Sequence, residues 1–106
     1  MDKAEVITKL KLYADLVKKI FPVRMIILFG SHAKNCAGEH SDIDVAVVVD
    51  RNDDDYLESR QKLFQLGSDI DCKIEPVLIE INQGDPSGFF EEIQGTGEII
   101  YQDPQI

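Results

Sequence analysis

Two short apolar segments, joined by a polar loop, constrain the fold of this chain more than any other feature. Residues 24–29 (RMIILF) and 42–49 (DIDVAVVV) are rich in aliphatic and β-branched residues, a composition typical of buried strands. Neither run is long enough to cross a bilayer. The loop between them, GSHAKNCAGEHS, is polar and contains glycine. The pattern therefore predicts two buried strands with a polar connection.

A helical pattern precedes the first of these strands. Asp2 is a candidate N-cap for a helix that runs to about Ile20. Phe21-Pro22 ends it, because the residue before a proline is disfavoured in the helical region. The predicted apolar stripe recurs at helical spacing and comprises Val6, Ile7, Leu10, Tyr13, Ala14, Val17 and Ile20.

The second half of the chain continues the alternation of helices and strands. Residues 56–66 predict a helix with Leu57, Leu63 and Phe64 roughly on one side, and Gly67 is its expected stop. The remaining predicted elements are a strand over 70–79, a helix over 89–94 and a short strand over 99–101. This order predicts one α/β (α+β) domain over residues 1–106, with a small mixed sheet flanked by helices.

The charge balance excludes one class of function. The chain has 106 residues, and its 20 acidic and 11 basic side chains give a formal net charge of −9. Such a field repels polyanions, so we expect no general DNA or RNA binding. Cys36 and Cys72 form no metal-ligand pattern and are expected to be reduced thiols. The N-terminal segment does not resemble a signal peptide, so we expect a cytoplasmic protein that does not associate with membranes.

Paired carboxylates at the start of the second strand suggest a metal site. Side chains alternate along a strand, so Asp42 and Asp44 point to the same face, where their charges repel. A divalent cation such as Mg²⁺ resolves this conflict, because it binds carboxylate and phosphate oxygens. A third carboxylate is expected on the next strand, where Asp71 and Glu75 would share a face with Lys73. We prefer Glu75, because a mainly apolar run follows it.

Gly30 and Ser31 follow the first apolar strand directly. Ser31 is a candidate cap for a short helix that reaches Lys34. The free N–H groups at such a junction favour anions, and glycine allows a phosphate to approach the backbone. A phosphate cradle beside paired carboxylates predicts a site for a nucleotide and a metal ion. Taken alone, Gly-Ser is more often a simple turn and Asp-x-Asp a solvated pair, and His32 and His40 are expected to be loop residues rather than catalysts.

The segment GSHAKNCAGEHSDIDVAVVV resembles the signature of the nucleotidyltransferase superfamily with the DNA polymerase β-like fold. That signature is Gly-Ser, ten residues, then Asp-x-Asp, and His32 to Ser41 supply the ten residues here. The small size of the chain resembles that of the minimal nucleotidyltransferases, which occur with HEPN-domain proteins as toxin–antitoxin pairs. The element order extends the resemblance to about residues 1–80, and GTGEIIYQ, residues 95–102, is similar to the C-terminal segment of that group.

The resemblance implies a site and a reaction. Gly30 and Ser31 would bind the triphosphate, and Asp42, Asp44 and Glu75 would bind Mg²⁺. Lys34 stands where the family often has arginine, which keeps the positive charge without the bidentate geometry. The implied reaction transfers a nucleoside monophosphate, with ATP as the expected donor, to an acceptor hydroxyl. That acceptor would be a tyrosine of a HEPN toxin.

Two further points stay open at this stage. The chain has little room for the extra domain with which larger relatives hold the nucleoside, so a HEPN partner or a second copy is expected to complete the site. The alternative function is a non-catalytic module, which either binds nucleotide without transferring it or neutralises a partner by contact.

Phe89 and Phe90 are expected to be core or interface residues rather than a platform for base stacking.

Overall fold

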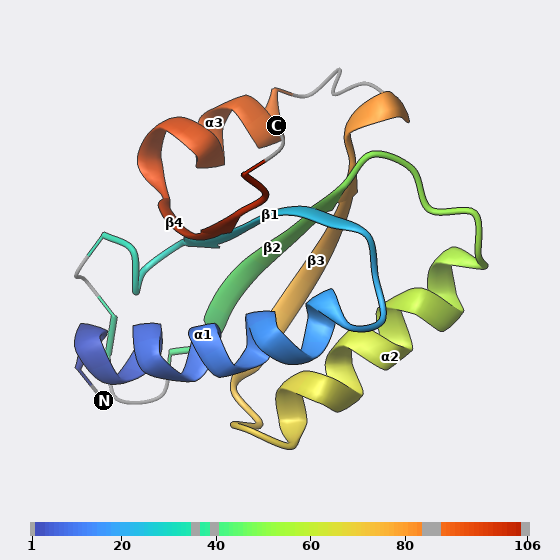
Figure 1. Cartoon of the computed structure of the whole chain (residues 1–106). Helices are drawn as coiled ribbons and strands as arrows, with labels where there is room; N and C mark the ends of the chain where they lie inside the picture. The colour runs from blue at the N-terminus through green and yellow to red at the C-terminus, as the bar shows by residue number, and fades with distance from the viewer. Residues whose placement is uncertain (1, 35–36, 39–40, 84–87, 105–106) are drawn as a thin grey trace.

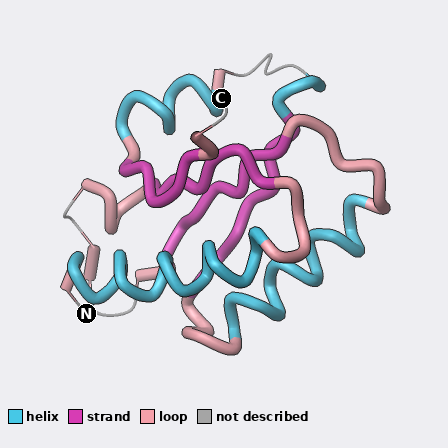
Figure 2. Tube along the Cα trace, in the orientation of Figure 1, coloured by secondary structure: helices cyan, strands magenta, loops and turns pink. Residues whose placement is uncertain are grey.

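A four-stranded sheet with helices on both faces forms the centre of the computed structural model, which describes residues 2–34, 37–38, 41–83 and 88–104 (Figures 1 and 2). The elements are α1 (Lys3–Lys18), β1 (Val23–Phe29), β2 (Ile43–Val49), α2 (Tyr56–Ser68), β3 (Ile74–Glu80), a 3₁₀ turn (Ile81–Gln83), α3 (Phe89–Thr96) and β4 (Glu98–Gln102). None of the described helices is both long and apolar enough to span a membrane.

The sheet is mixed, as the sequence predicts, and has the strand order β3-β2-β1-β4. The central strand β1 is antiparallel to both β2 and β4, whereas β2 is parallel to β3. The parallel pair follows from the connection, because α2 carries the chain back along the sheet before β3 begins. The α+β fold with a mixed sheet is confirmed.

The N-terminal helix follows its predicted stripe except at Ile7, which is only half-buried, and at its end. The Asp2 side chain caps α1 by accepting a hydrogen bond from the backbone N–H of Glu5 at 2.8 Å. The buried residues of α1 are Val6, Leu10, Tyr13, Ala14 and Val17. Ile20 was expected to complete the stripe, but α1 ends at Lys18 and 53% of Ile20 is exposed. The chain has left helical geometry before Pro22, and Phe21 is buried instead.

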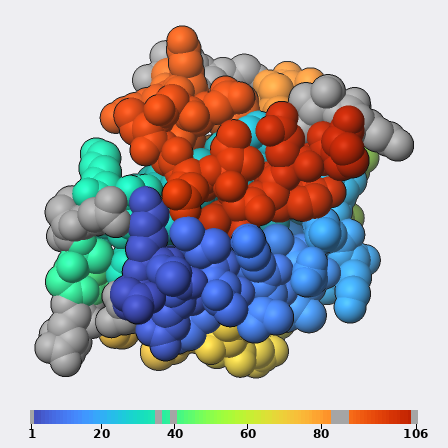
Figure 3. Space-filling view, turned by 60° about the vertical axis from the view of Figure 1, so that its left-hand side comes forward, coloured from blue at the N-terminus to red at the C-terminus, as the bar shows by residue number. Residues whose placement is uncertain are grey.

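The helices divide into two layers around the sheet. Residues of α1 and α2 pack on one face, where the Tyr13 hydroxyl donates a hydrogen bond to the carbonyl oxygen of Leu63 at 3.0 Å. The other face carries a smaller cluster that includes Ala46, Val48 and Ile93 of α3. Figure 3 shows that the first turns of α1 lie against β4 and against the segment that follows Gly30. The sheet therefore has one fully covered face and one that α3 covers in part.

Three predictions about the second half are wrong. Gly67 does not stop α2 but lies within it, buried, where an added Cβ would come within 2.9 Å of Cγ2 of Ile74. The glycine therefore serves close packing between α2 and β3. Leu57, expected on the apolar side of the helix, is 71% exposed. The third strand begins at Ile74 rather than at residue 70, because the segment before it forms turns.

Candidate nucleotide and metal site

The candidate site is built around the first residues of β2 and β3. The parallel register places Asp44 opposite Glu75, so both side chains project from the same face of the sheet. Asp42 lies just before β2, two residues from Asp44, and shares that side by the alternation of the strand. Asp44 is half-buried, whereas Asp42 and Glu75 are exposed. Ala46 and Val48 show that this is the face on which α3 packs.

The three carboxylates act on one another electrostatically. Burial raises the pKa of Asp44, the negative charge of Asp42 raises it further, and His32 opposes this effect. The pKa of Glu75 is also raised, first by desolvation, then by the charge of Asp42 and a hydrogen bond with it, and then by Asp44. The positive charge of Arg60, on α2, acts in the opposite direction on Glu75. The site therefore carries negative charge that a bound cation would relieve.

This donor set is compatible with Mg²⁺ only if the nucleotide helps to bind the ion. Within the described ranges, no group of three or more histidine, cysteine, aspartate or glutamate side chains is arranged to hold a metal ion. The carboxylates are thus close enough to raise the pKa of Asp44 and of Glu75 without forming a complete cage. Mg²⁺ commonly takes one or two carboxylates and fills its remaining positions with water and substrate phosphates. Asp42 and Asp44, with Glu75 beside them, fit that pattern.

Gly30, directly after β1, lies against one of these carboxylates, Asp44. Gly30 has a φ angle of +76°, and a Cβ at this position would clash with Oδ2 of Asp44. Both the backbone conformation and the close approach therefore require glycine. Residues 31–34 form a turn and not the predicted short helix, with the backbone N–H of Lys34 donating to the carbonyl oxygen of Gly30 at 3.2 Å. Ser31 is half-buried and Lys34 is exposed.

The sequence did not indicate that two further residues, His32 and Arg60, lie near the site and act on its carboxylates. His32 was expected to be a loop residue, yet only 6% of it is exposed and its Nε2 lies 3.4 Å from the carbonyl oxygen of Ser41. It thus connects the turn after Gly30 with the residue before Asp42. Arg60 was not singled out, because a single arginine in a polar helix gives no signal in the sequence. Asn35, Cys36 and His40 lie outside the described residues.

The structure separates the two candidates for the third carboxylate. Asp71 lies in the turn before β3, where its Oδ2 accepts a hydrogen bond from Nζ of Lys9 at 2.8 Å. The backbone N–H of Lys73 donates to its Oδ1 at 2.9 Å. These two hydrogen bonds lower the pKa of Asp71. Asp71 therefore does not share a strand face with Lys73 and Glu75, as the sequence had suggested, and only Glu75 lies opposite Asp44.

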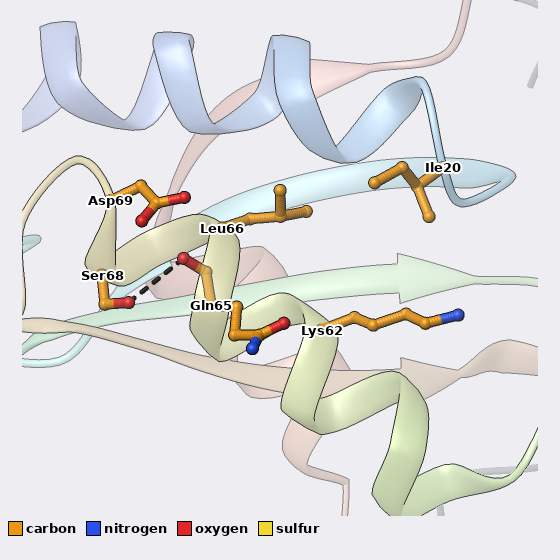
Figure 4. A pocket seen from close by; sticks show the side chains of 6 residues that line it. All are labelled: Ile20, Lys62, Gln65, Leu66, Ser68 and Asp69. Atoms are coloured by element: carbon orange, nitrogen blue, oxygen red, sulfur yellow. Dashed lines mark hydrogen bonds between the residues drawn. The ribbon is translucent and has the colours of Figure 1, made fainter.

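A large cavity lies away from the candidate site. A cavity of about 750 Å³ opens between the end of α1 and α2, and its lining residues are Ile20, Lys62, Gln65, Leu66, Ser68 and Asp69 (Figure 4). It lies on the side of the sheet that α1 and α2 cover and contains none of the candidate residues. We assign the site by its chemistry rather than by this volume, because a site for a solvated metal and a triphosphate can be shallow.

Comparison with solved structures supports the fold. A Sulfolobus solfataricus protein assigned as a nucleotidyltransferase aligns with a TM-score of 0.67 at 16% identity, over 94% of this chain and 83% of the other. A MntA–HpeT toxin–antitoxin structure with two aspartate-to-glutamate substitutions gives a TM-score of 0.63 at 20% identity, over 99% and 77%. A toxin–antitoxin structure with AMP-PNP gives 0.64 at 24% identity, over 92% and 75%.

Comparison of sequences gives the family. No curated protein matches the chain. The sequence model described as "Polymerase beta, Nucleotidyltransferase" matches residues 10–106, which include Gly30, Ser31, both motif aspartates and Glu75. The chain therefore belongs to the polymerase β-type nucleotidyltransferase family.

Proposed function

We propose that this chain is a Mg²⁺-dependent nucleotidyltransferase (EC 2.7.7 type) that transfers a nucleoside monophosphate, AMP from ATP, to an acceptor hydroxyl. One observation carries the proposal: Gly30, which opens the turn, packs directly against Asp44, and Asp44 lies opposite Glu75. A backbone turn that can bind anions therefore adjoins the carboxylates that would bind a cation. This combination suits a metal–triphosphate complex.

Each group of the site has a role in this reaction. The backbone of Gly30 and Ser31 would bind the β- and γ-phosphates, with Lys34 as a nearby cation. Asp42, Asp44 and Glu75 would bind Mg²⁺. When bound, Mg²⁺ supplies neutralisation of the charge that develops on the leaving pyrophosphate. The protein's remaining task is to orient the donor and the acceptor.

The chemical step requires no nucleophilic side chain. The acceptor oxygen forms a bond to the α-phosphorus while the bond between the α-phosphorus and the bridging oxygen breaks, and pyrophosphate leaves. One of the site carboxylates takes the proton of the acceptor hydroxyl, so the oxygen that is newly bonded to the α-phosphorus carries no positive charge.

We further propose a cytoplasmic antitoxin in which residues 1–106 form one transferase domain. The relatives crystallised as toxin–antitoxin complexes, one of them with AMP-PNP, support this assignment. The acceptor would be a tyrosine of a HEPN-type partner, which would also help to hold the nucleoside. A second copy of this chain could fill the same structural role.

A rival function is favoured by one observation. Because the described residues contain no complete group of metal ligands, the chain could bind a partner by contact alone and catalyse no transfer. The two functions differ in what the carboxylates do. Contact alone predicts that replacing Asp42 and Asp44 leaves neutralisation of the partner intact, whereas transfer predicts loss of neutralisation with the complex preserved.

The first experiment is a calorimetric titration of AMP-PNP, with and without Mg²⁺, into the wild type and the Asp42→Asn/Asp44→Asn variant. The proposal predicts Mg²⁺-dependent binding to the wild type and its loss in the variant, with the melting temperature retained. Equal binding by both proteins would refute the metal site. If the wild type does not bind, the same titration is repeated on the complex with its partner. Failure there as well would leave contact alone as the function.

A further inference from the structure

Lys3, in the first turn of α1, joins two segments that are distant in the sequence. Its Nζ donates a hydrogen bond to the carbonyl oxygen of Ala33 at 3.2 Å and lies 3.5 Å from Oε1 of Glu98. Ala33 is part of the turn that follows Gly30, and Glu98 is the first residue of β4. In Figure 3 the start of α1 lies between these two segments. One ammonium group thus connects α1, β4 and the candidate phosphate turn.

The β4 end of this connection is firmly placed. Glu98 pairs with Leu28 of β1 in the antiparallel register. At the preceding residue, Gly97, an added Cβ would come within 2.6 Å of the carbonyl oxygens of Ile93 and Leu28, so the backbone is closely packed there. Oε2 of Glu98 is buried and makes no hydrogen bond with the described residues. The interaction of Oε1 with Lys3 is therefore an important restraint on this carboxylate.

Two further contacts help to hold the turn. The backbone bond from Lys34 to Gly30 closes it, and His32 approaches Ser41 at a long distance of 3.4 Å. A hydrogen bond from a charged donor is stronger than one between neutral groups. The Lys3 side chain is also only partly exposed, at 31%, so water competes less for its hydrogen bonds. Lys3 thus supplies a charged contact from outside the motif to the backbone of the turn.

We propose that Lys3 is a positioning residue for the triphosphate: it holds the turn of residues 31–34 in the conformation that binds phosphate. The inference rests on the proposed function, since it assigns the turn to the nucleotide. It also extends the site beyond the Gly-Ser and Asp-x-Asp motif, to the N-terminus of α1 and the start of β4. Lys3 acts through the backbone of Ala33 and is not a catalytic residue.

The test uses AMP-PNP with Mg²⁺, titrated calorimetrically into the full chain. Lys3→Met removes the hydrogen bond and the charge while keeping a similar length, and we expect about tenfold weaker binding. Lys3→Arg keeps a charged donor and should restore most of the affinity. Lys11→Met is the matched control, because Lys11 is an exposed lysine of the same helix. It should bind as the wild type does.

A second readout needs no nucleotide. Hydrogen exchange of the Lys34 amide, which bonds to Gly30, reports the stability of the turn directly. It should be faster in Lys3→Met than in the wild type, and near the wild-type rate in Lys3→Arg. Unchanged exchange in Lys3→Met overturns the inference, as does an equal loss of affinity in Lys3→Met and Lys11→Met. If neither the wild-type chain nor its complex with the partner binds AMP-PNP, the proposed function fails, and hydrogen exchange alone decides whether Lys3 holds the turn.

Discussion

Asp44 and Glu75 lie directly opposite each other on the neighbouring parallel strands β2 and β3, with their side chains on the same face of the sheet. Asp42 lies near enough to raise the pKa of both. An arrangement of like charges destabilises the fold when no cation is present. These carboxylates cluster at the start of two strands, beside the turn that begins at Gly30. Such a cluster is typical of a binding site, because it costs stability that only a bound ligand recovers.

The pH dependence of stability should reveal this conflict. Because the pKa of Asp44 is raised in the folded state, its protonated form stabilises the fold below about pH 4, and this contribution is lost as pH rises through the folded-state pKa. Asp44→Asn should therefore be more stable than the wild type at pH 7 without Mg²⁺, by at most about 1 kcal/mol because the group is partly exposed. Thermal unfolding should show that the stability difference between Asp44→Asn and the wild type becomes smaller as the pH falls toward 3.

The matched control for this measurement is Asp15→Asn, an exposed aspartate of α1. It should change stability little at any pH. Addition of Mg²⁺ with AMP-PNP should raise the melting temperature of the wild type and leave that of Asp44→Asn unchanged. A variant less stable than the wild type at pH 7 would mean that Asp44 makes favourable contacts that outweigh the repulsion.

Glu75→Gln should weaken Mg²⁺-dependent binding of AMP-PNP by about tenfold or more, because it removes a carboxylate opposite Asp44. Asp71→Asn is the matched comparison from the neighbouring turn and should leave the affinity unchanged. Titration calorimetry on both variants decides which acid belongs to the site. A loss of affinity in Asp71→Asn alone would reverse the assignment.

The same Asp71→Asn variant should affect stability in a pH-dependent way. Asp71 bonds to Lys9 and its pKa is lowered in the folded state. Its contribution is therefore present above about pH 4 and is lost as pH falls through the folded-state pKa. We expect a lower melting temperature than the wild type at pH 7 and equal values at about pH 2. If the melting temperatures of the variant and the wild type still differ at about pH 2, Asp71 stabilises the fold by packing rather than by its charge.

Gly30→Ala should abolish nucleotide binding as well as reduce stability. The positive φ angle alone costs about 1 to 2 kcal/mol for alanine, and the new Cβ would displace the Asp44 carboxylate. Gly88→Ala is a matched control, since Gly88 has a φ angle of +71° with no atom within 4 Å of the added Cβ. Both variants should be destabilised in denaturant, Gly30→Ala by more because of the clash with Asp44, but only Gly30→Ala should lose AMP-PNP binding. Retained binding in Gly30→Ala would exclude the turn from the site.

Gly67→Ala should destabilise the fold by about 1 to 2 kcal/mol, although alanine favours helices. The added Cβ would press against Ile74, which is buried and cannot move away. Gly95→Ala, in α3, meets no atom within 4 Å and should gain up to about 1 kcal/mol. Urea unfolding measures both. Stabilisation by Gly67→Ala would show that α2 and β3 can separate slightly without cost.

The sequence by itself determined those features that depend on local geometry. Asp2 caps α1, the apolar runs form β1 and β2, and Asp42 and Asp44 share a face. Each follows from the period of a helix or strand, or from a hydrogen bond three residues along the chain, so neighbours in sequence suffice to predict it. The Gly-Ser and Asp-x-Asp motif identified the family for the same reason, because its spacing is a property of one connected segment.

Only the tertiary structure decided which distant residues meet. The register of β3 places Glu75 opposite Asp44 and leaves Asp71 with Lys9. The packing of α2 on β3 puts Gly67 inside a helix that its sequence would end there. The contact of Lys3 with Ala33 joins residues 30 positions apart. Such contacts depend on how elements pack and on the direction in which each strand runs, and local periodicity carries no information about either.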